Sequence, residues 1–390
     1  MRDQIVGHLQ RGLGAYVADL TALAGIDSGS YSKGGIDQVQ SIFAERLARA
    51  GFEIDRRANA EWGDDLVARR RGTGAGRVLL IGHADTVYPD GTAVTRPVRI
   101  EGDRLIGPGT CDMKAGILSG VRAVEALDVV GWDDYELLTV VIVSDEEIET
   151  RHSVELLREE GPRHHAVLTL EAARANGDIV TSRKATRWFL IEAAGKAAHA
   201  GVEPEKGASA TLAIARVIDA CAGLNGKRAG MTANIGRIRG GANPNIVADQ
   251  ADALIDLRAW TNDDLEELVA EVRGIVETEW VPGVTQSMRL NGGSGMPAME
   301  RSAGTIRLEE IAIRTAANLG FPLKGTATGG GSDVSIAVHA GTPGLDGLGP
   351  IGGLDHSPDE YIDVSSIVPR TALLALLIAG ICADPELVRD

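Results

Sequence analysis

The fold is decided by the stretch Arg77-Val-Leu-Leu-Ile-Gly-His-Ala-Asp85. Its apolar part is short and continuous, as expected for a central strand that is buried on both faces. The polar residues His83 and Asp85 follow directly. Because ligands of open α/β sheets bind beyond the carboxyl ends of the strands, this stretch predicts both a buried strand and a candidate site.

Two further apolar runs end in the same way. Residues 136–143 lead into Asp145-Glu-Glu147, and residues 166–170 lead into Glu171. Helical patterns separate these runs, and strands that alternate with helices predict an α/β fold with a mostly parallel sheet. We therefore expect the polar side chains to meet at one edge of that sheet.

The order of elements changes between residues 181 and 292. One strand, a helix, two strands, a second helix and a last strand follow one another there, which is the βαββαβ order of a ferredoxin-like α+β domain. The α/β pattern resumes afterwards. We expect a larger domain in two parts, residues 1–180 and 293–390, with residues 181–292 inserted between them.

Composition and charge exclude several classes of function. The 390 residues include 39 Lys and Arg against 55 Asp and Glu, a net charge of −16, which argues against binding to a nucleic-acid backbone. Cys111, Cys221 and Cys382 lie far apart and predict no disulfide framework. There is no secretory leader pattern, and the apolar stretch 372–383 is too short to cross a bilayer. We expect a cytoplasmic protein that binds no membrane.

The polar strand ends suit a metal centre. Histidine nitrogens and carboxylate oxygens are ligands for Zn²⁺, although a lone His or an acidic pair is more often structural. Asp85 lies on the same side of the chain as His83 and can orient its imidazole. Glu146 and Glu147 point oppositely on an extended chain, so one can bind metal while the other acts as a base. Asp112, otherwise a helix cap, can bridge two metals.

Six segments occur in one order along nearly the whole chain: His83-Ala-Asp85, Gly107-Pro-Gly-Thr-Cys-Asp-Met-Lys114, Asp145-Glu-Glu147, Glu171, Gly195-Lys-Ala-Ala-His-Ala-Gly201 and His356-Ser-Pro. Together they resemble the dizinc metallopeptidase and amidohydrolase family of aminoacylase, glutamate carboxypeptidase and succinyl-diaminopimelate desuccinylase, peptidase family M-twenty. The layout is most similar to the glutamate carboxypeptidase branch. The resemblance implies a zinc-exopeptidase-like catalytic domain and an inserted lid domain that forms a homodimer.

The resemblance also implies two Zn²⁺ per subunit, for which Co²⁺ or Mn²⁺ can substitute. One metal would be held by His83, Asp112 and Glu171. The other would be held by Asp112, Glu147 and His356. Asp112 would thus bridge the two.

Catalytic roles follow from the same resemblance. Glu146 would be the general base and later the acid for the leaving amine, and Asp85 would orient His83. His199, in the inserted domain, would help to polarise the scissile carbonyl. The catalytic site would be complete only when the two domains approach.

Substrate contacts are implied at four positions. Arg258 and Asn245 match residues that bind the substrate's carboxylate in the family, and an Arg fork suits a carboxylate. Gly330 and Gly331 lie in a glycine loop that permits close backbone approach. A surface salt bridge for Arg258 and a structural turn for the glycines are the alternatives.

The chain departs from the family in two places. Residues 148–153 carry bulky and charged side chains where small ones are usual, which would reshape the rim of the pocket. Gly295-Met296-Pro297 lacks the Arg of the glutamate-releasing branch, which puts an acidic side-chain preference in doubt. Glu171 stands where the carbamoylase branch uses a His, which argues against ureido substrates.

The main hypothesis is zinc-dependent hydrolysis of an amide in a small molecule or short peptide with a free carboxylate, releasing an amino acid as a carboxypeptidase or dipeptidase does. An alternative is a deacylase acting on acetyl, aryl or fatty acyl amino acids. A non-catalytic dimeric binding protein and a single-metal regulator are further alternatives from other classes.

Overall fold

The structure is a computed structural model that describes residues 1–293 and 295–388. The chain forms two compact units. The catalytic unit contains Met1–Ser182, Glu300–Thr328 and Ser332–Asp390, and the inserted unit contains Arg183–Met299 and Gly329–Gly331. The return to the catalytic unit therefore lies several residues beyond the expected position, and the triglycine segment groups with the inserted unit.

The catalytic unit is built on a six-stranded sheet in the order β1-β2-β6-β3-β7-β14. The four strands β6, β3, β7 and β14 are parallel, and β1 and β2 are antiparallel additions at one end. The bounds are β1 (Glu53–Arg57), β2 (Asp65–Arg71), β3 (Arg77–His83), β6 (Leu137–Val143), β7 (Ala166–Thr169) and β14 (Gly344–Leu345). Buried residues run through β3 and β6, and the predicted mostly parallel α/β sheet is confirmed.

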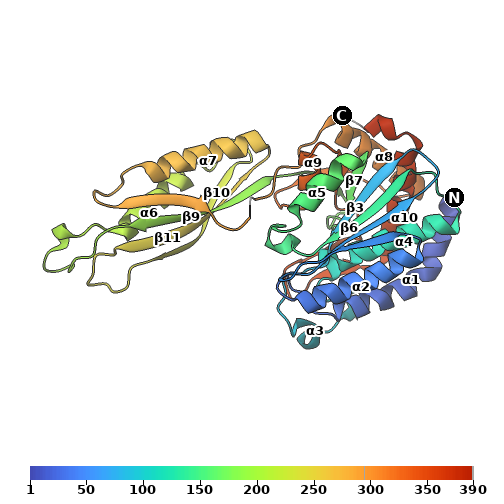
Figure 1. Cartoon of the computed structure of the whole chain (residues 1–390), viewed down its shortest axis with the longest axis horizontal. Helices are drawn as coiled ribbons and strands as arrows, with labels where there is room; N and C mark the ends of the chain where they lie inside the picture. Colours follow the sequence, from blue (N-terminus) through green and yellow to red (C-terminus); the bar gives the residue numbers. More distant parts are fainter. Residues whose placement is uncertain (294, 389–390) are drawn as a thin grey trace. The chain divides into compact units, whose positions relative to one another are not determined.

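Helices lie on both sides of this sheet (Figure 1). One group packs around α10 and contacts β3, and the other contacts β7 through α9. The first group contains α1 (Arg2–Ala24), α4 (Ala115–Val129), α8 (Ala303–Leu319) and α10 (Val364–Ala383), and the second contains α5 (Val154–Glu160) and α9 (Val334–His339).

Helix α10 is the most apolar of the long helices. Among the described residues it alone is long and apolar enough to cross a membrane, but 78% of its apolar window is buried within the structure. Its neighbours are α1, α4 and α8. This packing accounts for its composition.

Shorter elements complete the catalytic unit. They include an antiparallel sheet in the order β15-β16-β5-β4 and the pair β13-β8, none of which the sequence patterns indicated. The bounds are α2 (Lys33–Arg49), α3 (Thr92–Thr95), β4 (Arg99–Glu101), β5 (Arg104–Ile106), β8 (Ile179–Arg183), β13 (Gly325–Thr328), β15 (Gly352–Gly353) and β16 (Tyr361–Asp363).

The inserted unit has the predicted βαββαβ order. Its elements are β9 (Ala185–Ala194), α6 (Ala210–Ala222), β10 (Thr232–Gly240), β11 (Gln250–Ala259), α7 (Asn262–Glu277) and β12 (Thr285–Leu290). The strands form one antiparallel sheet in the order β10-β11-β9-β12. Ser209 and Thr261 cap the two helices by accepting a backbone N–H, and both helices bury an apolar face against the sheet.

Arg370 ties α10 to the sheet edge that carries the polar strand ends. Its guanidinium is buried and donates to the carbonyl oxygens of Gly349, Gly177 and Gly347 at 3.1, 3.0 and 2.5 Å. Gly349 in turn donates its N–H to the carbonyl of Glu171 at 2.8 Å. Burial lowers the pKa of Arg370 to about 10, so it remains charged at neutral pH.

Replacing Arg370 by Met is expected to lower the free energy of unfolding by about 3 kcal/mol, because two buried carbonyls and one half-buried carbonyl lose a charged donor. Urea unfolding followed by circular dichroism measures the change. Arg314→Met, at an exposed position of α8, is the matched control and should stay within about 0.5 kcal/mol of the parent. Equal stability of the two variants would contradict the role given to Arg370.

Candidate metal centre

Three neighbouring parallel strands deliver the polar residues to one edge of the sheet. His83 is the last residue of β3, Asp145 and the two glutamates follow β6, and Glu171 follows β7. The register pairs His83 with Val143 and Ile81 with Thr169, so the strands end almost level. The edge therefore collects side chains that are far apart in sequence.

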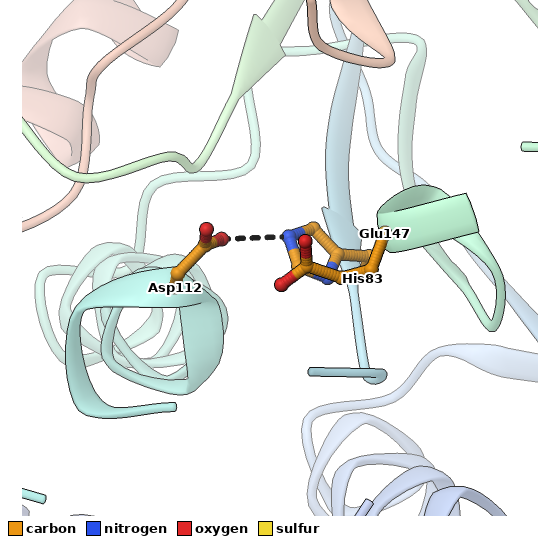
Figure 2. A group of neighbouring side chains, drawn as sticks. All are labelled: His83, Asp112 and Glu147. Carbon is orange, nitrogen blue, oxygen red and sulfur yellow. Dashed lines mark hydrogen bonds and ion pairs between the residues drawn. The ribbon is translucent and has the colours of Figure 1, made fainter. Parts of the chain in front are cut away.

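Asp112 lies between the two histidines. Its Oδ1 is 2.9 Å from Nε2 of His83, and its Oδ2 is 3.2 Å from Nε2 of His356. Figure 2 shows the Asp112 carboxylate pointing towards the His83 ring, with Glu147 next to that ring. Each imidazole also faces one glutamate: His83 Nε2 is 3.5 Å from Glu171 Oε1, and His356 Nε2 is 3.2 Å from Glu147 Oε2.

Asp85 is fully buried and organises the base of the site. His83 Nδ1 lies 3.0 Å from the Asp85 carbonyl oxygen and 3.3 Å from its carboxylate, which leaves Nε2 free to face the centre. The same carboxylate accepts the hydroxyl of Ser30 at 2.7 Å and the backbone N–H groups of Glu146 and Glu147 at 3.2 Å each. Asp85 thus fixes a histidine and the glutamate turn together.

The expectation that Glu146 and Glu147 lie on an extended chain is wrong. They form a 3₁₀ turn, Glu146–Ile148, so their different directions come from the turn and its anchor on Asp85. Glu147 contacts His356, and its buried Oε1 has no hydrogen-bond partner among the residues that the structure describes. A buried carboxylate oxygen without a donor is the arrangement that a cation completes.

The donor set fits divalent metal ions. Ligand atoms of His83, Asp112 and Glu147 lie within 4.8 Å of one another, and so do those of Asp112, Asp355 and His356. Asp112 belongs to both groups. The arrangement is a possible dinuclear ligand cluster of imidazole nitrogens and carboxylate oxygens.

Electrostatics in the cluster favour bound cations. Hydrogen bonds with Asp112 and Glu147 raise the pKa of His356 to about 11. Burial lowers the pKa of His83, but its bonds to Asp112 and Asp85 outweigh this and raise it well above 6.5. Burial and the neighbouring charge of Asp112 raise the pKa of Glu147 to about 7. Without metal, the positive charge in the site is therefore supplied by protons bound to the two histidines.

Glu146 is in a different environment. Burial raises its pKa well above 4.5, and the nearby carboxylates of Asp333, Glu171 and Glu147 raise it further against the opposing effect of His83. A carboxylate with a raised pKa is suited to accept and return a proton near neutral pH. Among the described residues, Glu146 belongs to neither group of candidate metal ligands.

Glu360 is a positioning residue that sequence reasoning missed. Its buried carboxylate accepts the backbone N–H of Asp112 at 3.0 Å, of Cys111 at 2.8 Å and of Gly109 at 3.1 Å. It also accepts the hydroxyl of Tyr88 at 2.6 Å. One side chain therefore holds the whole turn that presents Asp112.

Asp333 and Asp355 were also missed. Asp333 follows the glycine loop, is buried, and accepts the hydroxyl of Thr150 at 2.5 Å, while its Oδ2 has no partner. Burial raises its pKa to about 8. Asp355 directly precedes His356, so its place beside a candidate ligand was a signal available in the sequence.

The inserted unit brings two predicted residues close together. His199 pairs with Ile246 in an isolated bridge, and the N–H of Ala200 donates to the carbonyl of Asn245 at 2.9 Å. His199 is exposed, and its Nδ1 accepts the N–H of Gly201 at 3.2 Å. The catalytic role of His199 and the substrate-binding role of Asn245 stay predictions.

The other predicted substrate contacts have internal partners. Arg258 donates to Asp256 at 2.8 Å and to the Gly329 carbonyl at 2.7 Å. The carbonyls of Gly330 and Gly331 accept from Arg183 at 3.2 and 3.0 Å. The glycine loop is thus anchored by two arginines, and its contact with substrate also stays a prediction.

Comparison with known proteins places the chain in a family. The model of "Peptidase family M20/M25/M40" matches residues 79–380, which contain all the candidate ligands. The chain belongs to this family. M20 members are generally metal-dependent hydrolases, and the protein is accordingly a metal-dependent hydrolase of this family.

The relatives of this chain within the M20 family are named for several different activities. Carboxypeptidase G2 of Pseudomonas sp. (strain RS-16) is 28% identical over 374 residues, which cover 95% of this chain and 90% of the relative. Succinyl-diaminopimelate desuccinylase of Stenotrophomonas maltophilia (strain R551-3) is 27% identical over 361 residues, covering 87% and 92%. The predicted family is therefore confirmed.

Solved structures share the fold. A tripeptidase from Staphylococcus aureus superposes with a TM-score of 0.80 at 22% identity, covering 95% of this chain and 99% of that one. An M20 metallo-carboxypeptidase from Sulfolobus solfataricus gives a TM-score of 0.79 at 14% identity, covering 94% and 99%. At these identities the likeness shows the M20 fold alone.

Substitution of Glu360 by Gln is expected to lower metal affinity by about 10- to 100-fold, because an amide nitrogen then faces backbone N–H groups and releases the Asp112 turn. Competition with a chromogenic chelator measures the affinity, and circular dichroism checks the fold. Asp359→Asn removes an exposed neighbouring carboxylate and is the matched control. Equal affinities for both variants would refute the positioning role.

Metal binding at pH 7 is expected to release protons. The carboxylates hold His83 and His356 protonated beforehand, and an imidazole must be neutral to bind metal. Glu147, with a pKa of about 7, is also partly protonated, so about two to three protons leave per chain. Metal affinity should consequently rise with pH. Calorimetry in buffers of different ionisation enthalpy counts the protons, and His356→Ala should release about one fewer. Release of none would contradict the assigned protonation.

Proposed function

We propose that this protein is a zinc-dependent amidohydrolase that cleaves an amide bond and releases a free amino acid, as a carboxypeptidase or dipeptidase does. The observation that carries the proposal is the division of the Asp112 carboxylate between His83 and His356, with Glu147, Glu171 and the separate acid–base candidate Glu146 around it. This is a complete set of parts for metal-assisted hydrolysis.

The metal ligands are assigned as the resemblance implied. His83, Asp112 and Glu171 would hold one cation, and Asp112, Glu147 and His356 would hold the other. The mixture of nitrogen and oxygen donors supports Zn²⁺, and the same ligands also accept Co²⁺ or Mn²⁺.

Hydrolysis then follows from the residues of the chain. Divalent cations held by these residues would supply a water acidic enough to lose a proton near neutral pH. Glu146 accepts that proton on its carboxylate and returns it to the leaving nitrogen as the amide C–N bond breaks. Asp85 keeps the His83 imidazole oriented, and Glu360 keeps Asp112 in place. The products are a carboxylic acid and an amine, and one water is consumed.

The substrate is a small molecule or short peptide whose free carboxylate would bind Arg258 and Asn245, with His199 assisting at the carbonyl. A guanidinium is suited to such a carboxylate. An N-acyl-amino-acid deacylase is the alternative, and it draws support from relatives named desuccinylase and N-acetyl-L-citrulline deacetylase. We further propose a homodimer formed through the inserted unit and a cytoplasmic location, in keeping with the three free, buried cysteines.

Glu146→Gln is expected to lower kcat/KM by about 10²- to 10⁴-fold while both metals remain bound, because only the proton acceptor is lost. Mass spectrometry of a panel of dipeptides and N-acyl amino acids measures turnover, and elemental analysis measures metal. Glu155→Gln, an exposed residue of α5, is the control. An undiminished rate in the Glu146 variant would show that the base lies elsewhere.

A further inference from the structure

A cleft beside the candidate ligand Glu147 has no part in the reaction as described so far. It has a volume of about 430 Å³ and lies between three segments, residues 29–32, 86–90 and 147–148. All three belong to the catalytic unit. Glu147 is therefore shared by the cleft and the candidate metal centre, and both lie within a single unit.

The lining of the cleft is largely apolar. Tyr31, Val87, Tyr88, Pro89 and Ile148 supply most of it. Its lining also includes the carboxylates of Asp90 and Glu147 but no basic side chain. An anionic group would meet two acidic residues and no basic side chain among the lining residues, whereas an uncharged apolar group would be desolvated favourably.

Tyr31 forms an exposed aromatic wall that is held in place from behind. Its side chain is 73% exposed, and its ring centroid lies 5.2 Å from that of Trp62. The Trp62 ring in turn lies 4.8 Å from that of His152. These tilted ring contacts limit the freedom of the Tyr31 ring, so a ligand that packs on Tyr31 has less entropy to overcome.

The third ring is part of the segment that departs from the family pattern. His152 belongs to residues 148–153, and its backbone N–H donates to the buried carboxylate of Asp145 at 2.6 Å. Ile148 from the same segment lines the cleft. The bulky residues that replace small ones therefore build this wall and connect it to the end of β6.

Both walls of the cleft are bonded to the metal-binding framework. Ser30 donates to Asp85, which anchors the backbone of the glutamate turn. On the other side, Tyr88 donates to Glu360, which anchors Asp112. A group seated in the cleft is consequently held at a fixed place relative to the reacting centre, as catalysis requires.

We propose that this cleft binds an aromatic or large apolar group on the acyl side of the scissile amide, with Tyr31 as the platform for its ring. The assignment rests on the proposed function. The released amino acid carries a carboxylate that needs a cation, and the cleft lining offers none, so the acyl side is the part that fits. An aroyl group and an N-terminal aromatic residue share this chemistry.

The test compares four types of substrate on the full-length, metal-loaded protein: N-benzoyl, phenylalanyl, N-acetyl and glycyl derivatives, each made with alanine and with glutamate. At least one aromatic type is expected to exceed its small counterpart by about tenfold in kcat/KM, or about 1.4 kcal/mol. The benzoyl type distinguishes a deacylase, and the phenylalanyl type distinguishes a dipeptidase.

Variants of Tyr31 locate the preference. Tyr31→Ala is expected to reduce the aromatic-to-small ratio of kcat/KM by about fivefold, whereas Tyr31→Phe keeps the ring and the ratio. Val129→Ala, at the exposed end of α4, is the matched control. A readout without turnover is the affinity of the metal-free protein for N-benzoyl-alanine, measured by saturation-transfer NMR, which Tyr31→Ala should weaken.

The outcomes separate the two proposals. Turnover of small and aromatic substrates at equal rates, with a ratio that Tyr31→Ala leaves unaltered, would overturn the cleft assignment and leave the hydrolase intact. Failure of all eight substrates would contradict the proposed function as framed. In that case the NMR result decides the cleft alone: binding that Tyr31→Ala weakens supports it, and absence of binding refutes it.

Discussion

Mutual repulsion among buried carboxylates is the constraint on which the catalytic unit depends. Those at one edge of the sheet include the buried Asp85 and Asp333 and the half-buried Asp112, Glu146, Glu147 and Glu171. Carboxylates placed together away from water are costly unless cations or hydrogen-bond donors neutralise them. The protein offers two imidazoles and a set of backbone N–H groups, and the raised pKa values of Glu147 and Asp333 show that these donors do not suffice. Metal binding and the stability of this edge are thereby coupled.

Much of this arrangement could be predicted from the sequence because it follows from local patterns. The apolar runs that became β3, β6 and β7 each end in polar residues, and parallel strands bring those ends together. The βαββαβ order was equally readable, since its strands and helices have clear periodicities. The residue pattern indicated a metal centre with Asp112 as a possible bridge, and the family resemblance then divided His83, Asp112 and His356 between two metals.

The rest depends on contacts between distant segments. Glu360 resembles a solvated loop residue in the sequence, and only the pairing of β16 with β5 brings it beneath the Asp112 turn. The turn at Glu146–Ile148 gave no helical or strand signal because three residues are too few for a period. Tyr31, Trp62 and His152 are separated along the chain, so their stack was invisible although the unusual segment 148–153 was noticed.

The chain order of the two units also bears on synthesis by the ribosome. Nearly all of the inserted unit is one continuous segment, Arg183–Met299, whereas the catalytic unit needs α8, β14 and α10 from the far end of the chain. The inserted unit can therefore acquire its sheet and helices while the catalytic unit still lacks its central apolar helix. His356 and Glu360 emerge late as well. A nascent chain consequently lacks the candidate ligand His356 and the positioning residue Glu360 until the ribosome has passed residue 360, by which point the inserted unit has been synthesised.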